Sequence, residues 1–190
     1  VGTLWAEEMS STFHSIEHDI IKKHQTKFGQ VRKPVHSKCF YWEGPYQEVN
    51  LPVHAIYKNM RRVCKTWIYP QLDIQPTKIP DDTLVIHIRS GDIFDKNVPN
   101  PEQYSPNPYH FYHTLLDSFD KAIVVTENDN YNPIVEELSY DKKVTIQRGS
   151  VAEDFSTLMG AKHVANSGVG TFAVAAALCS QNIEHFYCTD

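Results

Sequence analysis

The sequence has no clustered basic residues and no long apolar run. Its 190 residues contain 18 Lys and Arg against 23 Asp and Glu, a net charge of −5, with no basic block or stripe. Nucleic acid is therefore not expected as the main partner, because phosphate contacts need clustered Lys and Arg. No apolar run approaches the roughly 20 residues that cross a bilayer, so we expect no membrane span in this chain.

Paired cysteine motifs are also missing. The four cysteines, Cys39, Cys64, Cys179 and Cys188, form no C-x-x-C pair, which argues against a zinc site. Disulfides and buried thiols are both compatible with this spacing. No N-x-S/T sequon is present, and the acidic start of the chain does not resemble a signal peptide. The compartment stays open between the cytoplasm and the lumen of the secretory pathway.

The composition is that of an ordinary globular protein, with 41% hydrophobic and 22% charged residues. Near residue 80 the sequence pattern changes to an alternation of strand and helix signals. Before that point, apolar spacing predicts helices over 9–28 and 53–72 and a strand over 31–41. Residues 70–80 contain three prolines and are predicted to form a linker or crossover. We therefore expect a short, mainly helical N-terminal region over 1–80 and a second domain over 81–190.

The second domain alternates strands with helices. Strands are predicted at 83–88, 122–126, 143–147, 163–166 and 183–187, separated by helices ending near 119, 138, 161 and 179. Asn107-Pro108 and Asn132-Pro133 have the composition of an N-cap followed by a first helical residue. This alternation predicts an α/β fold of the Rossmann-like kind, with a mostly parallel sheet and helices on both faces.

The strand over 83–88 ends in a combination that a buried strand rarely carries. His87 and Arg89 lie at its end, and Ser90-Gly91-Asp92 then forms a turn. The planar guanidinium of arginine suits two oxygens of a phosphate or carboxylate. Ligands of open α/β sheets bind just past the carboxyl ends of strands, so we expect an anion there.

Two further strand ends carry candidate residues, Thr126–Asp129 and Asn166–Phe172. Small residues such as Gly168 and Gly170 let backbone N–H groups face an anion, and the following helix adds its partial positive charge. Arg89 and this turn together would bind a pyrophosphate. The spacing Gly168-x-Gly170-x-x-Ala173 also matches a loose dinucleotide fingerprint, which keeps an NAD-dependent dehydrogenase as an alternative. That match lies in the last unit of the sheet rather than the first.

Four motifs in order resemble a known family. His87-x-Arg89-x-x-Asp92 is similar to the H-x-R-x-x-D motif of the α1,2/α1,6/protein-O-fucosyltransferase superfamily. The resemblance extends over residues 83–180 through Pro106–Tyr112, Val124–Glu127 and a closing segment made of Asp154–Met159 together with Ser167–Phe172. It implies a GT-B glycosyltransferase that uses GDP-fucose and a glycan acceptor, with no metal and no further cofactor. No D-x-D motif occurs to hold a divalent ion.

The resemblance also implies roles for individual residues. Arg89 would bind the β-phosphate and His87 would orient the phosphate or sugar, while Asp154 would position the base and ribose. The diphosphate and base pocket would be lined by Ser167, Gly168, Gly170, Thr171 and Phe172. Phe172 is equally compatible with a place in the core.

An inverting transfer needs a base at the acceptor hydroxyl. Asp92 is the first candidate, and Glu43 and Asp95 are the next. Asp92 fits equally well as a cap that holds the turn.

Two positions differ from the family pattern. Ser90 stands where many members have a second arginine, and the region before residue 81 is shorter than the usual first domain. Another donor such as UDP-xylose therefore stays open, and so does a glycan- or nucleotide-binding module without turnover.

Overall fold

The computed structural model describes residues 53–93, 106–128 and 132–188. The chain divides into two compact units, residues 1–63 and 64–190. Residues 64–80, assigned above to the N-terminal region, thus belong to the second unit. The described part of the first unit is helix α4 (Val53–Val63), whose last turn contains Arg61 and Arg62. The helix predicted over 9–28 and the strand predicted over 31–41 lie outside the described residues.

The second unit is built on an all-parallel sheet of five strands. These are β1 (Thr83–Ile88), β2 (Lys121–Thr126), β3 (Val144–Gln147), β4 (His163–Ala165) and β5 (His185–Tyr187). Their spatial order is β3-β2-β1-β4-β5. All five predicted strands are confirmed, each with its ends within two residues of the expected positions. The α/β class and the Rossmann-like arrangement are confirmed with them.

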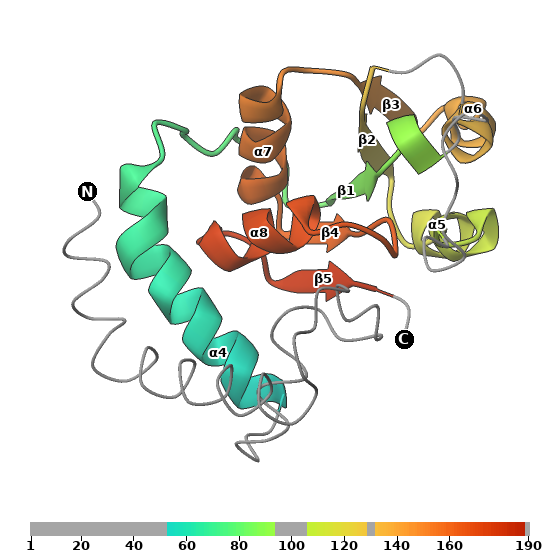
Figure 1. Cartoon of the computed structure of the whole chain (residues 1–190). Helices are drawn as coiled ribbons and strands as arrows, with labels where there is room; N and C mark the ends of the chain where they lie inside the picture. The colour runs from blue at the N-terminus through green and yellow to red at the C-terminus, as the bar shows by residue number, and fades with distance from the viewer. Residues whose placement is uncertain (1–52, 94–105, 129–131, 189–190) are drawn as a thin grey trace, which may run out of the picture. The chain divides into compact units, whose positions relative to one another are not determined.

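Helices cover both faces of this sheet, as Figure 1 shows. Helices α5 (Tyr109–Leu116) and α6 (Pro133–Ser139) lie on one side, and α7 (Val151–Gly160) and α8 (Phe172–Cys179) on the other. Alternate residues of β1 serve the two cores, because successive side chains of a strand point to opposite faces. Leu84 and Ile86 pack in the core under α5 and α6, and Val85 packs in the core under α7 and α8. All six residues of β1 are buried, as expected for a central strand.

The segment 64–80 is part of the core under α7 and α8. The helix predicted over 53–72 is α-helical only to Val63 and continues as a π-helical turn, η2 (Cys64–Ile68), and a 3₁₀ turn, η3 (Tyr69–Gln71). Apolar side chains of the following extended stretch, Leu72, Ile74 and Ile79, pack against the same core. A Cβ added to Gly160 would lie 1.7 Å from the carbonyl oxygen of Thr77. The proline-rich stretch is therefore a packed layer on α7 rather than a free linker.

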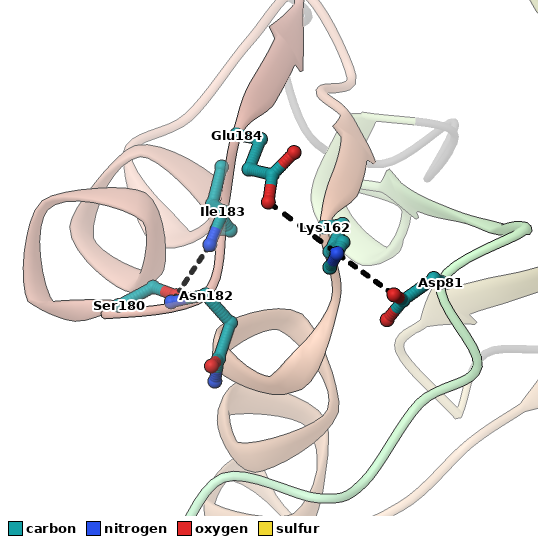
Figure 2. Close-up of polar contacts among 6 residues, drawn as sticks. All are labelled: Asp81, Lys162, Ser180, Asn182, Ile183 and Glu184. Carbon is teal, nitrogen blue, oxygen red and sulfur yellow. Dashed lines mark hydrogen bonds and ion pairs between the residues drawn. The ribbon is translucent and has the colours of Figure 1, made fainter.

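Polar residues at the amino edge of the sheet bond to one another. Lys162, just before β4, lies between two carboxylates, with its Nζ 2.7 Å from Asp81 and 3.4 Å from Glu184 (Figure 2). The hydroxyl of Ser180 donates to the carbonyl of Met159 (2.6 Å) and accepts the N–H of Ile183 (3.1 Å). These contacts connect the segments that lead into β1, β4 and β5.

One of the two predicted helix caps is confirmed and the other is wrong. Asn132 caps α6, with its Oδ1 accepting the N–H groups of Ile134 (3.0 Å) and Val135 (3.2 Å). Helix α5 instead begins at Tyr109 with Pro108 as its N-cap. The side chain of Asn107 donates from Nδ2 to the carbonyl of Asn166 at 3.1 Å. The side-chain amide of Asn107, which the local sequence predicts to cap α5, thus bonds to Asn166 in a distant part of the chain instead.

Candidate functional site

The strand order reverses between β1 and β4, so the carboxyl ends of these two strands mark the candidate site. From β1 the chain proceeds outward to β2 and β3, then returns to β4 on the other side of β1. The helices after β1 and after β4 therefore leave the sheet on opposite faces. In open α/β sheets, ligands bind at this reversal of strand order. Two of the predicted site segments, His87–Asp92 and Asn166–Phe172, begin at these two strand ends.

Arg89 lies directly beside the turn that follows β4. A Cβ added to Gly170 would be 3.3 Å from Cδ of Arg89 and 3.7 Å from its Nη1. The absence of a side chain at Gly170 thus leaves the space that the arginine side chain occupies. The structure brings together the cation and the glycine turn that the sequence predicts to act jointly.

The turn after β4 is held by its own hydrogen bonds and by Asn107. Gly168 and Gly170 have φ of +76° and +83°, which L side chains rarely adopt. A Cβ on Gly168 would lie 2.2 Å from Oδ1 of Asn107, and the N–H of Asn107 donates to the carbonyl of Ser167 at 3.0 Å. Ser167 is fully buried, and its hydroxyl donates to the carbonyl of Val169. The turn is therefore preorganised, with Ser167 acting as internal support.

Helix α8 starts immediately after this turn. Thr171 is its N-cap residue, and the threonine side chain makes no capping hydrogen bond. The first N–H groups of a helix lack partners within the helix and carry a partial positive charge. The start of α8 and the guanidinium of Arg89 thus both flank the Gly168–Thr171 turn, and both favour an anion.

His87 is buried and neutral at physiological pH. Its side chain is 7% exposed, and burial lowers the pKa to about 4, with the neighbouring charge of Arg89 adding to the effect. Its ring centroid lies 5.3 Å from that of Phe172, which in turn contacts Phe155 at 5.4 Å. Phe172 is half-buried, so it packs on the core and still reaches the surface.

Ser90 forms a hydrogen-bonded network with Glu127, which belongs to a candidate segment of the sequence, and with Asn132, which sequence reasoning did not assign to the site. Its backbone N–H donates to Oε2 of Glu127, and its hydroxyl accepts from Nδ2 of Asn132 at 2.8 Å. Ser90 is fully buried. This network connects the ends of β1 and β2 to the start of α6. The sequence signal that could have indicated Asn132 was the helix-cap motif Asn132-Pro133. The Oδ1 of Asn132 caps α6, and its side-chain Nδ2 can therefore donate to a second partner.

Asp154 lies on α7, the helix that follows β3. Strand β2 separates β3 from β1 in the sheet. Its Oδ1 accepts hydrogen bonds from Nε2 of Gln147 (2.7 Å) and from the N–H of Gly149 (3.2 Å). The carboxylate thereby holds the connection between β3 and α7. Beside this connection is an open hollow of about 690 Å³, which the stretch 73–77 also lines. Contact of Asp154 with a base or ribose stays a prediction.

The catalytic base also stays a prediction. Asp92 belongs to the short 3₁₀ turn η4 (Gly91–Ile93), three residues after Arg89. Glu43 and Asp95 lie outside the described residues.

The described part of the chain contains no group of three or more His, Cys, Asp or Glu arranged to hold a metal ion. Nor does it contain a helix long and apolar enough to cross a membrane.

No model of a known protein family matches the chain, and no curated protein matches it.

Proposed function

We propose that this protein is a metal-independent, inverting glycosyltransferase of the GT-B type. It would transfer L-fucose from GDP-fucose to a hydroxyl group of a glycan acceptor. The observation that carries the proposal is the position of Arg89 against the Gly168–Thr171 turn at the reversal of strand order. The four motifs that resemble the fucosyltransferase superfamily support the same activity.

The chemistry requires stabilisation of a leaving nucleoside diphosphate. Negative charge grows on the diphosphate as the bond to the sugar breaks, and preorganised donors lower the barrier most when they are fixed beforehand. Arg89 supplies a charged, bidentate donor. The backbone N–H groups at the start of α8 supply further donors without any movement of the chain.

His87 and Asp92 have distinct roles in this proposal. A neutral imidazole at His87 can donate one hydrogen bond to the phosphate or sugar without adding a second positive charge beside Arg89. Asp92 removes the proton from the acceptor hydroxyl as that oxygen attacks the anomeric carbon, with Glu43 and Asp95 as alternatives. Attack opposite the leaving diphosphate inverts the configuration of the sugar.

The position of Ser90 bears on the identity of the donor. Because Ser90 is buried and hydrogen-bonded to Asn132, it holds the turn that carries Arg89 instead of facing a ligand. The chain thus lacks the second cation that many family members have at this strand end. A nucleotide sugar such as UDP-xylose is therefore the alternative donor.

A dehydrogenase is the second candidate class, because the strand order is that of dinucleotide-binding sheets. In such sheets the glycine-rich turn follows the first strand and contacts the pyrophosphate. Here β1 is followed by Arg89 and Ser90, and the glycines follow β4. The cation on β1 makes a nucleotide sugar the better fit. A nucleotide- or glycan-binding module without turnover would share this site.

Thermal shift with a panel of nucleotides tests the proposal. Saturating GDP-fucose should raise the melting temperature, because a ligand that binds only the folded state stabilises it. Stabilisation by UDP-xylose or UDP-glucose alone would change the donor, and stabilisation by NADH alone would support the dehydrogenase. If no nucleotide sugar stabilises the protein, the proposal fails. Donor binding with neither hydrolysis nor transfer would identify a binding module.

Arg89 variants test the phosphate contact directly. Arg89→Ala should abolish the GDP-fucose shift, and Arg89→Lys should lose most of it because the bidentate contact is gone. Lys142→Ala is the matched control, since it removes one exposed positive charge just before β3, at the amino edge. Unchanged donor affinity in both Arg89 variants would refute the phosphate role.

A further inference from the structure

Two cysteines from distant parts of the sequence meet on the face of the sheet covered by α7 and α8. Cys64 is the first residue of η2, and Cys179 is the last residue of α8. Helix α8 packs against η2, and Cys64 packs against the apolar cluster that contains Cys179. The two thiols also interact, which shifts the pKa of each. Cys179 is buried, whereas Cys64 is half-exposed. The third described cysteine, Cys188, is exposed and follows β5.

We propose that Cys64 and Cys179 are a dithiol pair that low-molecular-weight disulfides oxidise to an intrachain disulfide. The packing of η2 on α8 makes the two thiols neighbours, which is the starting arrangement for an S–S bond of roughly 2 Å. This site is independent of nucleotide binding and would exist whatever the protein transfers.

The surroundings of the two sulfurs assign their order of reaction. The S–H of Cys179 donates to Cys64, which lowers the pKa of Cys64 to about 7 even though burial opposes the change. The donated hydrogen bond, burial and the charge of Cys64 raise the pKa of Cys179. The more accessible sulfur is therefore the one with substantial thiolate at neutral pH, and thiolates are the nucleophiles in disulfide exchange.

The reaction has two balanced steps. The Cys64 thiolate attacks one sulfur of oxidised glutathione, forms a mixed disulfide and releases one glutathione thiolate. The Cys179 thiol then loses its proton to solvent and attacks the Cys64 sulfur, which expels the second glutathione. Loss of the negative charge on Cys64 in the first step removes one of the causes that raise the pKa of Cys179. Two protein thiols become one disulfide, and one oxidised glutathione becomes two reduced molecules.

The disulfide would attach the segment 64–80 covalently to the end of α8. It would close a loop of more than one hundred residues that contains the whole sheet, except β5. Crosslinks across long loops restrict the unfolded chain strongly and thereby favour the folded state. We expect oxidation to raise the melting temperature by about 10 °C, as typical disulfide stabilisation does for a domain of this size.

Peptide mapping of the oxidised wild-type protein tests the assignment. The protein is incubated with oxidised glutathione, its remaining thiols are alkylated, and it is digested without reduction. Mass spectrometry should find the peptide of Cys64 joined to that of Cys179, with Cys188 alkylated. Alkylation of both residues after oxidation would overturn the proposal, and so would a bond from either one to Cys39 or Cys188.

Variants separate the pair from other effects of oxidation. Cys64→Ser and Cys179→Ala should each lose the increase in melting temperature, whereas Cys188→Ala should retain it. Cys64→Ser should leave Cys179 unmodified, because the entry point for glutathione is gone. Cys179→Ala should accumulate the mixed disulfide at Cys64, a mass gain that a merely structural role would not produce. No nucleotide is added, so failure here leaves the glycosyltransferase proposal untouched.

Discussion

At the amino edge of the sheet, Lys162 lies between the carboxylates of Asp81 and Glu184, whereas at the carboxyl edge Arg89 lies beside Gly170. Both residues are cations close to the central strands. The amino-edge cation forms two salt bridges with exposed acids. The carboxyl-edge cation follows a buried neutral histidine and lies against a turn with two glycines at positive φ.

The two edges differ in what they contribute to stability. Exposed ion pairs contribute little, because water already solvates both charges. A buried histidine is costly unless the surrounding structure holds it, and only glycine adopts a left-handed backbone readily. The carboxyl edge therefore concentrates a desolvated histidine and two positions that require glycine. Such concentration is typical of functional sites, and it predicts that mutations there have the larger effects.

The largest expected effect on stability at the carboxyl edge is its response to acid. The pKa of His87 is about 4 in the folded protein, against an ordinary value of 6.5. Between these two pH values the unfolded chain therefore binds a proton at His87 that the folded chain does not bind. Stability should consequently fall as the pH drops from 6.5 towards 4, by on the order of 3 kcal/mol. Urea unfolding at a series of pH values measures this slope.

His87→Gln should remove most of that acid dependence. His110→Gln is the control, since His110 is an exposed histidine of α5. An unchanged slope in His87→Gln would mean that other groups cause the loss of stability in acid.

Gly170→Ala should destabilise the protein by about 2 kcal/mol and also weaken donor binding. The substitution places a side chain in a backbone with φ of +83°, and its Cβ presses on Arg89. Gly91→Ala serves as the strain control, because φ there is +54° and the nearest atom of Glu127 is 3.9 Å away. If the two variants lose donor affinity equally, contact with Arg89 is not the reason.

Asn132→Ala should cost about 1 kcal/mol, because it removes a helix cap and one partner of the buried Ser90 hydroxyl. Its donor affinity should also decrease if the network holds Arg89 in place. Ser150→Ala removes the comparable cap of α7 and leaves Ser90 untouched. Chemical denaturation and nucleotide titration of both variants separate loss of a cap from loss of site geometry.

Lys162→Ala should have the smallest effect. The lysine side chain is 34% exposed and its partner Asp81 is 74% exposed, so solvent replaces both ion pairs. We expect an unfolding midpoint that cannot be distinguished from that of the wild type, and unchanged donor binding. A large loss of stability would show that substitutions at the amino edge destabilise the protein as much as substitutions at the carboxyl edge.

Local sequence was sufficient where one residue and its neighbours decide the outcome. The mainly apolar strand 83–88 is typical of a central position in the sheet. Asn132-Pro133 could cap α6 because the N–H partners of Asn132 are two and three residues away. Asn107-Pro108 has the same composition, yet Asn107 bonds to a carbonyl 59 residues further along the chain. No residue near Asn107 in the sequence indicates that the carbonyl of Asn166 will be its partner.

The candidate site divides in the same way. Its two candidate segments, His87–Asp92 and Asn166–Phe172, could be predicted from strand ends and glycine spacing, because parallel strands place their carboxyl ends at one edge. The supporting contacts could not be found, since Glu127 and Asn132 reach Ser90 only after the sheet has formed. The pairing of Cys64 with Cys179 was equally hidden, because it depends on how η2 packs on α8.

The sequence by itself determined the alternation of strands and helices, the buried central strand, and the presence of His87, Arg89 and two glycines at strand ends. These follow from periodicity and turn chemistry, which act over a few residues. Only the tertiary structure decided that β4 lies beside β1, which brings Gly170 against Arg89 and makes His87 a neutral, buried base. Those properties arise from neighbours about eighty residues apart, and only the packed sheet brings them together.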